Sequence, residues 1–190
     1  MKKRTSDPWI SADRYGRMLP VFMANLVVQD VERAVAFYKG VLGGRIHYAD
    51  PDFAAINLNG AELMLHADHT YDKHPWHPRL TGGERRGLGA ELRLFGVDPD
   101  VVESRARKAS APVLQPATST GHGWREVMVE DPDGYVWAVG IPTPSPQPSP
   151  PEGAREISNP LPSEERDAPN PLPSGEREVP NPLPSGERAG

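Results

Sequence analysis

Apolar residues in the first 142 positions follow strand and helix spacings in alternation. The apolar run 21–28 ends in two β-branched residues and predicts a buried strand. Asp30 comes next and predicts a helix start, because its carboxylate can accept hydrogen bonds from the free amides of a first turn. The following apolar residues are spaced three and four apart, which predicts one buried helix face that ends at Gly43 and Gly44: Val31, Ala34, Val35, Tyr38, Val41 and Leu42.

Three short segments with strand-like composition follow this predicted helix. They span residues 45–49, 53–58 and 62–67. Asn59 and Gly60 separate the last two, and an Asn-Gly pair between strand-like runs predicts a hairpin turn. The first half of the chain is therefore predicted to run strand, helix, strand, strand, strand.

The same order returns from Gly87 onward. Residues 88–95 predict a strand, and Asp98 followed by Pro99 predicts a helix start. The apolar positions of this second helix form a weaker stripe, made of Val101, Val102, Ala106 and Ala109. Three further strands are predicted at 113–115, 125–130 and 135–141, with a turn at 131–134 between the last two. The prediction is an α+β fold of two tandem β-α-β-β-β modules, at about residues 19–67 and 87–141.

The composition changes after residue 142. Thirteen of the 23 prolines lie between Thr143 and Gly190, and this stretch has no aromatic residue. The sequence Asn-Pro-Leu-Pro-Ser-x-Glu-Arg occurs there three times, with a period of 11 residues. One leucine per repeat cannot offset the entropy of ordering the repeat, so residues 143–190 are predicted to be a disordered tail. A proline-rich docking segment is the alternative. Residues 1–17 are predicted to be an N-terminal extension of a globular domain at 18–142.

Composition and charge exclude several classes of function. The chain has no cysteine, which rules out disulfides, thiolate metal sites and thiol nucleophiles and fits a cytoplasmic location. No apolar run is long enough to span a membrane, and polar residues follow the basic start where a signal peptide would be apolar. Most of the net charge of −5 lies in the tail, so the near-neutral body argues against a nucleic-acid partner.

Two motifs resemble the vicinal oxygen chelate superfamily, which contains glyoxalase I, the extradiol dioxygenases and the bleomycin resistance proteins. The first motif is Leu-Val-Val-Gln-Asp-Val-Glu-Arg-Ala-Val-Ala-Phe-Tyr at 26–38 with Val-Leu-Gly-Gly at 41–44, and the second is Glu-Asp-Pro-Asp-Gly-Tyr at 130–135. The resemblance covers about residues 19–141. It implies that the two sheets curl round a cleft and that the protein forms a homodimer.

The resemblance also implies where a metal would bind. Enzymes of this superfamily hold a divalent cation with His, Gln or Glu side chains on the first and last strands of each module. The corresponding positions here hold Met23, Met64, Leu92 (or Ala90 if the register shifts by one pleat, which is two residues) and Ala138. Sulfide and hydrocarbon side chains do not bind hard or borderline cations, so we expect no metal and no cofactor. An off-register cluster of Glu62, His66 and Glu91 is the alternative.

A cleft without a metal is expected to bind a ligand with apolar and amphipathic side chains. Alternation along strands predicts that the first, fourth and fifth strands present such residues inward, Leu94 of the fifth strand included. Trp124 adds an aromatic face, beside Arg125. The predicted ligand-binding residues are Met23, Asn25, Glu62, Met64, Leu92, Trp124 and Arg125. The alternatives are that the methionines only fill the core and that Arg125 and Glu126 form a surface ion pair.

Two functions follow from this interpretation. The first is a small-molecule-binding protein that resembles bleomycin resistance proteins and has no catalytic residue. The second is a lyase- or dioxygenase-type enzyme that uses a non-standard metal site or an acid or base such as Glu62 or His66. A structural or regulatory module without a ligand is a third.

Overall fold

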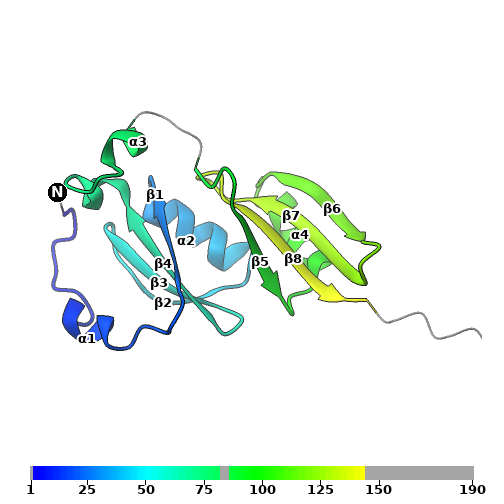
Figure 1. The fold of residues 1–190 in the computed structure, drawn as a ribbon, viewed down its shortest axis with the longest axis horizontal. Coiled ribbons are helices and arrows are strands. Elements are labelled where there is room, and N and C mark those ends of the chain that lie inside the picture. The colour runs from blue at the N-terminus through cyan, green and yellow to red at the C-terminus, as the bar shows by residue number, and fades with distance from the viewer. Residues whose placement is uncertain (1, 82–85, 144–190) are drawn as a thin grey trace, which may run out of the picture. The chain divides into compact units, whose positions relative to one another are not determined.

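The two predicted modules form two four-stranded sheets, each covered on one face by a helix (Figure 1). The computed structural model describes residues 2–81 and 86–143. The first sheet has the strand order β1-β4-β3-β2 and the second the order β5-β8-β7-β6, and β1 and β5 run parallel to their neighbours. The first module contains β1 (Ala24–Val28), α2 (Val31–Gly40), β2 (Arg45–Ala49), β3 (Phe53–Leu58) and β4 (Ala61–Ala67). The second contains β5 (Glu91–Phe95), α4 (Pro99–Lys108), β6 (Val113–Ser119), β7 (Trp124–Glu130) and β8 (Val136–Pro142).

The predicted tandem of β-α-β-β-β modules is therefore confirmed. Among the residues that the structure describes, three short helices lie outside the modules: α1 (Ala12–Gly16), the 3₁₀ helix η1 (Asp68–Tyr71) and α3 (His77–Thr81). The predicted disordered tail, apart from Thr143, lies outside the described residues. None of the helices in the described part of the chain is long and apolar enough to cross a bilayer.

The predicted helix starts and hairpin turn are present. The carboxylate of Asp30 accepts a hydrogen bond from the Arg33 N–H at 2.8 Å, and that of Asp98 accepts one from the Asp100 N–H at 2.9 Å. Asn59 and Gly60 have positive φ angles of 49° and 95°, as the two-residue turn of a tight hairpin requires. Local side-chain chemistry thus sets the first residues of both module helices.

Some predicted boundaries and buried positions are wrong. The fifth strand begins at Glu91 rather than Leu88, which is 86% exposed, and β6 continues to Ser119. In α4 the buried row is Pro99, Val102 and Ala106. Val101 is exposed because it lies off this row, and Ala109 is exposed as the C-cap residue that follows the last residue of α4.

A single apolar core contains residues of both modules. At their junction the Tyr38 hydroxyl of α2 donates a hydrogen bond of 2.7 Å to the buried carboxylate of Asp131. Burial raises the pKa of Tyr38, so this hydroxyl stays a donor. The other Asp131 oxygen accepts the N–H groups of Asp133 and Tyr135, both at 2.9 Å. The Asp-Pro-Asp-Gly motif therefore closes its own turn and also attaches the second module to the first.

Candidate ligand-binding site

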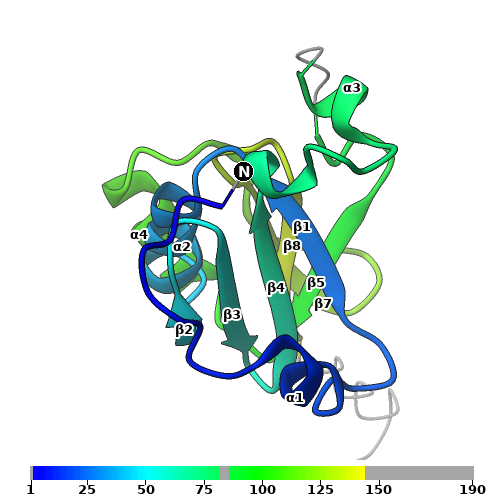
Figure 2. The same ribbon diagram turned by 90° about the vertical axis from the view of Figure 1, so that its left-hand side faces the viewer.

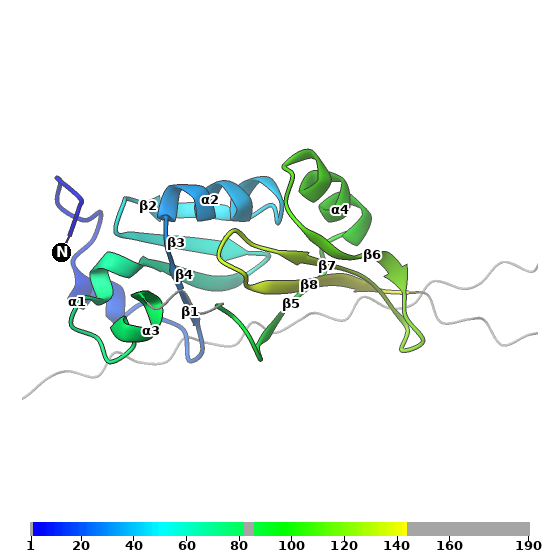
Figure 3. The same ribbon diagram turned by 90° about the horizontal axis from the view of Figure 1, so that it is seen from above.

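The N-terminal segment, residues 2–16, covers part of the first sheet on the face opposite α2 (Figures 2 and 3). The Trp9 ring stacks on the Tyr48 ring of β2, with centroids 5.7 Å apart and planes 11° apart. The Tyr15 ring of α1 meets the Phe53 ring of β3 edge-on at 5.6 Å. Residues predicted to be an extension outside the domain therefore pack on its sheet.

A buried carboxylate anchors this segment. Asp52, in the turn between β2 and β3, is 3% exposed, and it accepts the Lys3 N–H at 2.6 Å and the Arg4 N–H at 3.4 Å. The His69 Nε2 atom lies 2.7 Å from the same carboxylate. Burial alone would raise the pKa of Asp52, but the hydrogen bonds from His69 and the two N–H groups outweigh it and lower that pKa. Asp52 is therefore ionised at neutral pH and holds the segment by charge-assisted hydrogen bonds.

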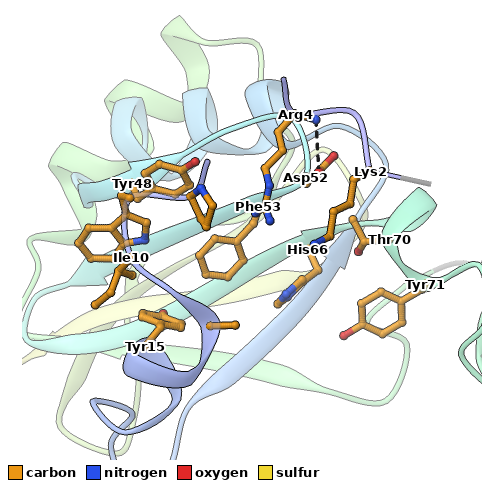
Figure 4. A pocket seen from close by; sticks show the side chains of 13 residues that line it. Lys2, Arg4, Ile10, Tyr15, Tyr48, Asp52, Phe53, His66, Thr70 and Tyr71 are labelled. Carbon is orange, nitrogen blue, oxygen red and sulfur yellow. Dashed lines mark hydrogen bonds between the residues drawn. The ribbon is translucent and has the colours of Figure 1, made fainter. Parts of the chain in front are cut away.

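A cavity of about 380 Å³ lies between the segment and the sheet (Figure 4). This volume is in the range of small-molecule pockets. Six of its thirteen lining residues carry an aromatic ring, and two cationic side chains enter it from the segment. The lining residues are Lys2, Arg4, Pro8, Trp9, Ile10, Ala12, Tyr15, Tyr48, Asp52, Phe53, His66, Thr70 and Tyr71.

A hydrogen-bonded chain of three side chains sets the chemistry of His66 at this cavity. The Asn25 amide nitrogen donates to the Tyr71 hydroxyl at 2.7 Å, so the Asn25 oxygen faces the Nδ1 atom of His66, 2.8 Å away. In that arrangement Nδ1 carries the proton and Nε2 has a free lone pair. Burial lowers the pKa of His66, although the charge of Asp50 opposes this. At neutral pH His66 is an uncharged acceptor, and Tyr71 keeps its hydroxyl proton for donation.

The residues predicted on the first module lie together but beside the cavity. Asn25 and Met64 are paired across β1 and β4 on the open face of the sheet, and Met23 precedes β1. Glu62 lies on the same face and accepts a hydrogen bond of 2.7 Å from Asn57, with His47 at 3.5 Å. Among the described residues that line the cavity, none belongs to the predicted ligand-binding set, and His66 comes from the predicted alternative.

On the second module the predicted strand face is wrong. Leu92 and Leu94 pack against the shared core on the α4 side, whereas the open face of β5 carries Glu91, Arg93 and Phe95. The physical reason is the register: Glu91 precedes the Asp98 cap by the same seven residues that separate Met23 from the Asp30 cap. A shift of one residue moves every side chain of a strand to the other face.

The structure separates Trp124 from Arg125. The Trp124 ring contacts the Phe95 ring on the open face, with centroids 5.0 Å apart. Arg125 points to the opposite face and binds Asp100 of α4 at 2.8 Å. Glu126 is paired with Arg93, so the alternative of an Arg125–Glu126 ion pair is wrong.

The side chains at the superfamily's metal positions do not fit a divalent cation. In the corrected register these positions hold Met23, Met64, Glu91 and Ala138, and the Glu91 carboxylate already accepts from Arg93 at 2.7 Å. In residues 2–81 and 86–143 no three His, Cys, Asp or Glu side chains converge on a point, which includes the alternative cluster of Glu62, His66 and Glu91. One carboxylate with two thioethers and a methyl group is not a donor set for Zn²⁺, Ni²⁺, Fe²⁺ or Mn²⁺.

The sequence interpretation missed the cavity because it set aside residues 1–17. One signal in the sequence could have found it: Trp9, Ile10 and Tyr15 are large apolar residues in an otherwise polar stretch. A segment that needed no contact with the domain would not require them.

Comparisons with known proteins agree with this fold. The model of the Glyoxalase/Bleomycin resistance protein/Dioxygenase superfamily matches residues 20–139. Uncharacterized protein Mb0911c of Mycobacterium bovis is 30% identical over 135 residues, which cover 65% of this chain and 84% of that protein.

Solved structures at lower identity share the fold. Hypothetical protein SA1046 of S. aureus is 21% identical, with a TM-score of 0.52 and coverage of 67% of this chain and 98% of that one. A glyoxalase/bleomycin resistance protein/dioxygenase from Nocardioides is also 21% identical, with a TM-score of 0.51 and coverage of 72% and 95%. The family match begins at residue 20, after the part of the chain that forms one wall of the cavity.

Proposed function

Because the chain belongs to the glyoxalase/bleomycin resistance protein/dioxygenase superfamily, we propose that it binds a small molecule by affinity alone, as bleomycin resistance proteins do. The observation that carries this proposal is the aromatic cavity between the N-terminal segment and the first sheet. Rings on both sides of the cavity, such as Trp9 and Phe53, offer large apolar surface at a low cost in side-chain entropy.

The chemistry of the metal positions favours binding over metal catalysis. A superfamily enzyme needs lone-pair donors that leave one coordination site open for substrate. Met23, Met64 and Ala138 cannot supply them. Metal analysis of purified protein is expected to find no stoichiometric Zn, Ni, Mn or Fe, and a stoichiometric ion would contradict this part of the proposal.

We also propose that the protein forms a homodimer. Large apolar side chains are exposed before β1 and on the open face of the second sheet, with Phe22 86% exposed and Phe95 49% exposed. Large apolar side chains exposed on a protein surface are typical of an interface. Light scattering is expected to give the mass of two chains for the natural protein and a lower mass for Phe22→Ser.

Binding is tested by thermal shift and isothermal titration with a panel of planar aromatic compounds. A compound that raises the melting temperature of the natural protein should bind Trp9→Ala at least about tenfold more weakly, since the substitution removes the stacked ring of the cavity wall. Trp76→Ala is the matched control, because Trp76 is 53% exposed and outside the cavity lining. Equal binding by all three proteins would place the site elsewhere.

A second candidate is supported by the Tyr71–Asn25–His66 chain. A neutral imidazole whose Nδ1–H is fixed by an acceptor can use its Nε2 as a general base. His66 would take a proton from the carbon beside a substrate carbonyl, and the electron pair would move to the carbonyl oxygen, which Tyr71 can hydrogen-bond. Deuterium exchange into an aryl ketone, followed by NMR, tests this activity. It should be lost in His66→Gln while ketone binding stays, and no exchange above the buffer rate would leave binding as the function.

A further inference from the structure

We infer that the cavity selects planar aromatic anions, such as aryl carboxylates, over neutral or cationic molecules of the same shape. This inference rests on the proposed binding function and names its ligand class. The groups that carry it are the cationic side chains of the N-terminal segment, which lies before the part of the chain that matches the superfamily.

Two cations extend into the cavity. Figure 4 shows that the Lys2 and Arg4 side chains both run from the segment toward Phe53 and His66, so that their charged ends lie among the aromatic rings. Only 21% of the Arg4 side chain is exposed. A positive charge in such a partly desolvated place interacts with a bound anion more strongly than one in open water.

The carboxylates near these cations are already occupied. One Asp50 oxygen accepts the N–H groups of Asp52 and Phe53 at 2.7 and 2.8 Å, and the other accepts the Tyr48 hydroxyl at 2.7 Å. Arg4 approaches Asp50 only at 3.8 Å, which leaves its guanidinium donors available. Asp52 is held by the segment's own N–H groups and by His69.

The remaining polar groups at the cavity also favour an anion. Tyr71 accepts from Asn25 and is left with a hydroxyl proton to donate. Because its pKa is lowered, His66 is uncharged at neutral pH and neither attracts nor repels an anion. Lys2, Arg4 and the Tyr71 hydroxyl together give the cavity wall three side chains that can donate hydrogen bonds to an anion. A guanidinium and a hydroxyl are the groups that proteins use to hold a carboxylate.

The walls specify a flat ring system. The stacked Trp9 and Tyr48 rings and the edge-on pair of Tyr15 and Phe53 leave ring faces and edges toward the same space. Aromatic ligands pack against such surfaces in stacked or edge-on geometry. The ligand class is therefore a planar aromatic body with an anionic group at the end that faces Lys2 and Arg4.

Three probes of equal shape and different charge test the inference on the full-length protein: 2-naphthoate, 2-naphthamide and 2-naphthylmethylammonium. Isothermal titration should give naphthoate at least about tenfold tighter binding than naphthamide, equal to about 1.4 kcal/mol, and weaker binding still for the cation. Only the naphthoate affinity should fall clearly between 50 and 500 mM salt.

Side-chain variants show whether the named cations cause the preference. In Lys2→Gln/Arg4→Gln the naphthoate and naphthamide affinities should come within about threefold, with naphthamide unchanged, because the segment's N–H bonds to Asp52 do not use these side chains. Arg107→Gln, which removes an exposed arginine of α4, is the matched control and should keep the full preference.

The outcomes separate this inference from the proposed function. Equal affinities for naphthoate and naphthamide in the natural protein, or a preference that survives in the double variant, would overturn the inference while binding itself stands. If none of the three probes binds, both the inference and the proposed function fail.

Discussion

The two sheets have the same topology, but their open faces, the faces without a module helix, differ. The first is covered by residues 2–16 and forms an aromatic cavity with them. The second carries a row of paired charges, in which Arg93 binds Glu91 and Glu126 beside the contact of Phe95 with Trp124. The helix-covered faces, by contrast, share one core. Burial preserves the common architecture of the modules, whereas the open faces differ, and the first of them forms the proposed binding site.

The largest expected effect is a loss of ligand affinity when the N-terminal segment is removed. Deletion of residues 2–17 should weaken binding of a planar aromatic ligand by at least about 100-fold, or about 2.7 kcal/mol, since half of the cavity lining is lost. Unfolding should stay cooperative because the shared core contains no residue of this segment. Titration calorimetry measures the affinity, and calorimetric melting measures the cooperativity of unfolding. Unchanged affinity would show that the two open faces do not differ in function.

The next largest effect is at the junction that holds both sheets together. Tyr38→Phe removes the hydroxyl that donates to Asp131 and leaves a buried carboxylate one hydrogen bond short. We expect a loss of about 1–3 kcal/mol in the free energy of unfolding, measured by urea denaturation. Tyr48→Phe is the control: the Tyr48 hydroxyl donates to Asp50 at the edge of the first sheet, and its removal should lower the free energy of unfolding by less.

A smaller effect concerns pH and belongs to the first sheet alone. Because burial lowers the pKa of His66, the unfolded chain binds more protons than the folded one as the pH falls below 6.5. The contribution of His66 to stability is therefore complete above pH 6.5 and declines below it. Melting temperatures from pH 7.5 to 5 should fall less steeply in His66→Gln. Parallel curves for the two proteins would contradict a lowered pKa of the half-buried His66.

The smallest effect is expected on the second sheet. Trp124→Ala removes the aromatic ring that we predicted to bind ligand, but this ring contacts Phe95 and lies outside the cavity lining. The affinity for a ligand held between Trp9 and Phe53 should change by less than about twofold. A larger loss of affinity would show that Trp124 contacts the ligand and that the open face of the second sheet also takes part in binding.

The fold was predictable because its signals are local. Asp30 and Asp98 each begin a helix with their own carboxylate, and Asn59 with Gly60 supplies the positive φ angles of a hairpin. The burial row of α2 follows from spacing alone, with Phe37 added. Such features depend on residues within a few positions of one another, which a sequence displays directly.

The site was less predictable because it depends on distant contacts and on strand register. The hydrogen bond from the Lys3 N–H to Asp52 joins residues 49 positions apart, and no periodic pattern in the sequence predicts it. Leu92 was placed on the wrong face because the position equivalent to Met23 was taken at Leu92 instead of Glu91, one residue away. The equal distances from Met23 and Glu91 to their caps would have given the correct face.

The anchoring of residues 2–16 by a few hydrogen bonds to Asp52 has a consequence for the evolution of this protein. Substitutions at Lys2, Arg4 or Trp9 alter the wall of the cavity without touching the shared core. Descendants of this chain could therefore acquire new ligand preferences while the inherited architecture stays equally stable, a freedom that residues inside the sheets do not have.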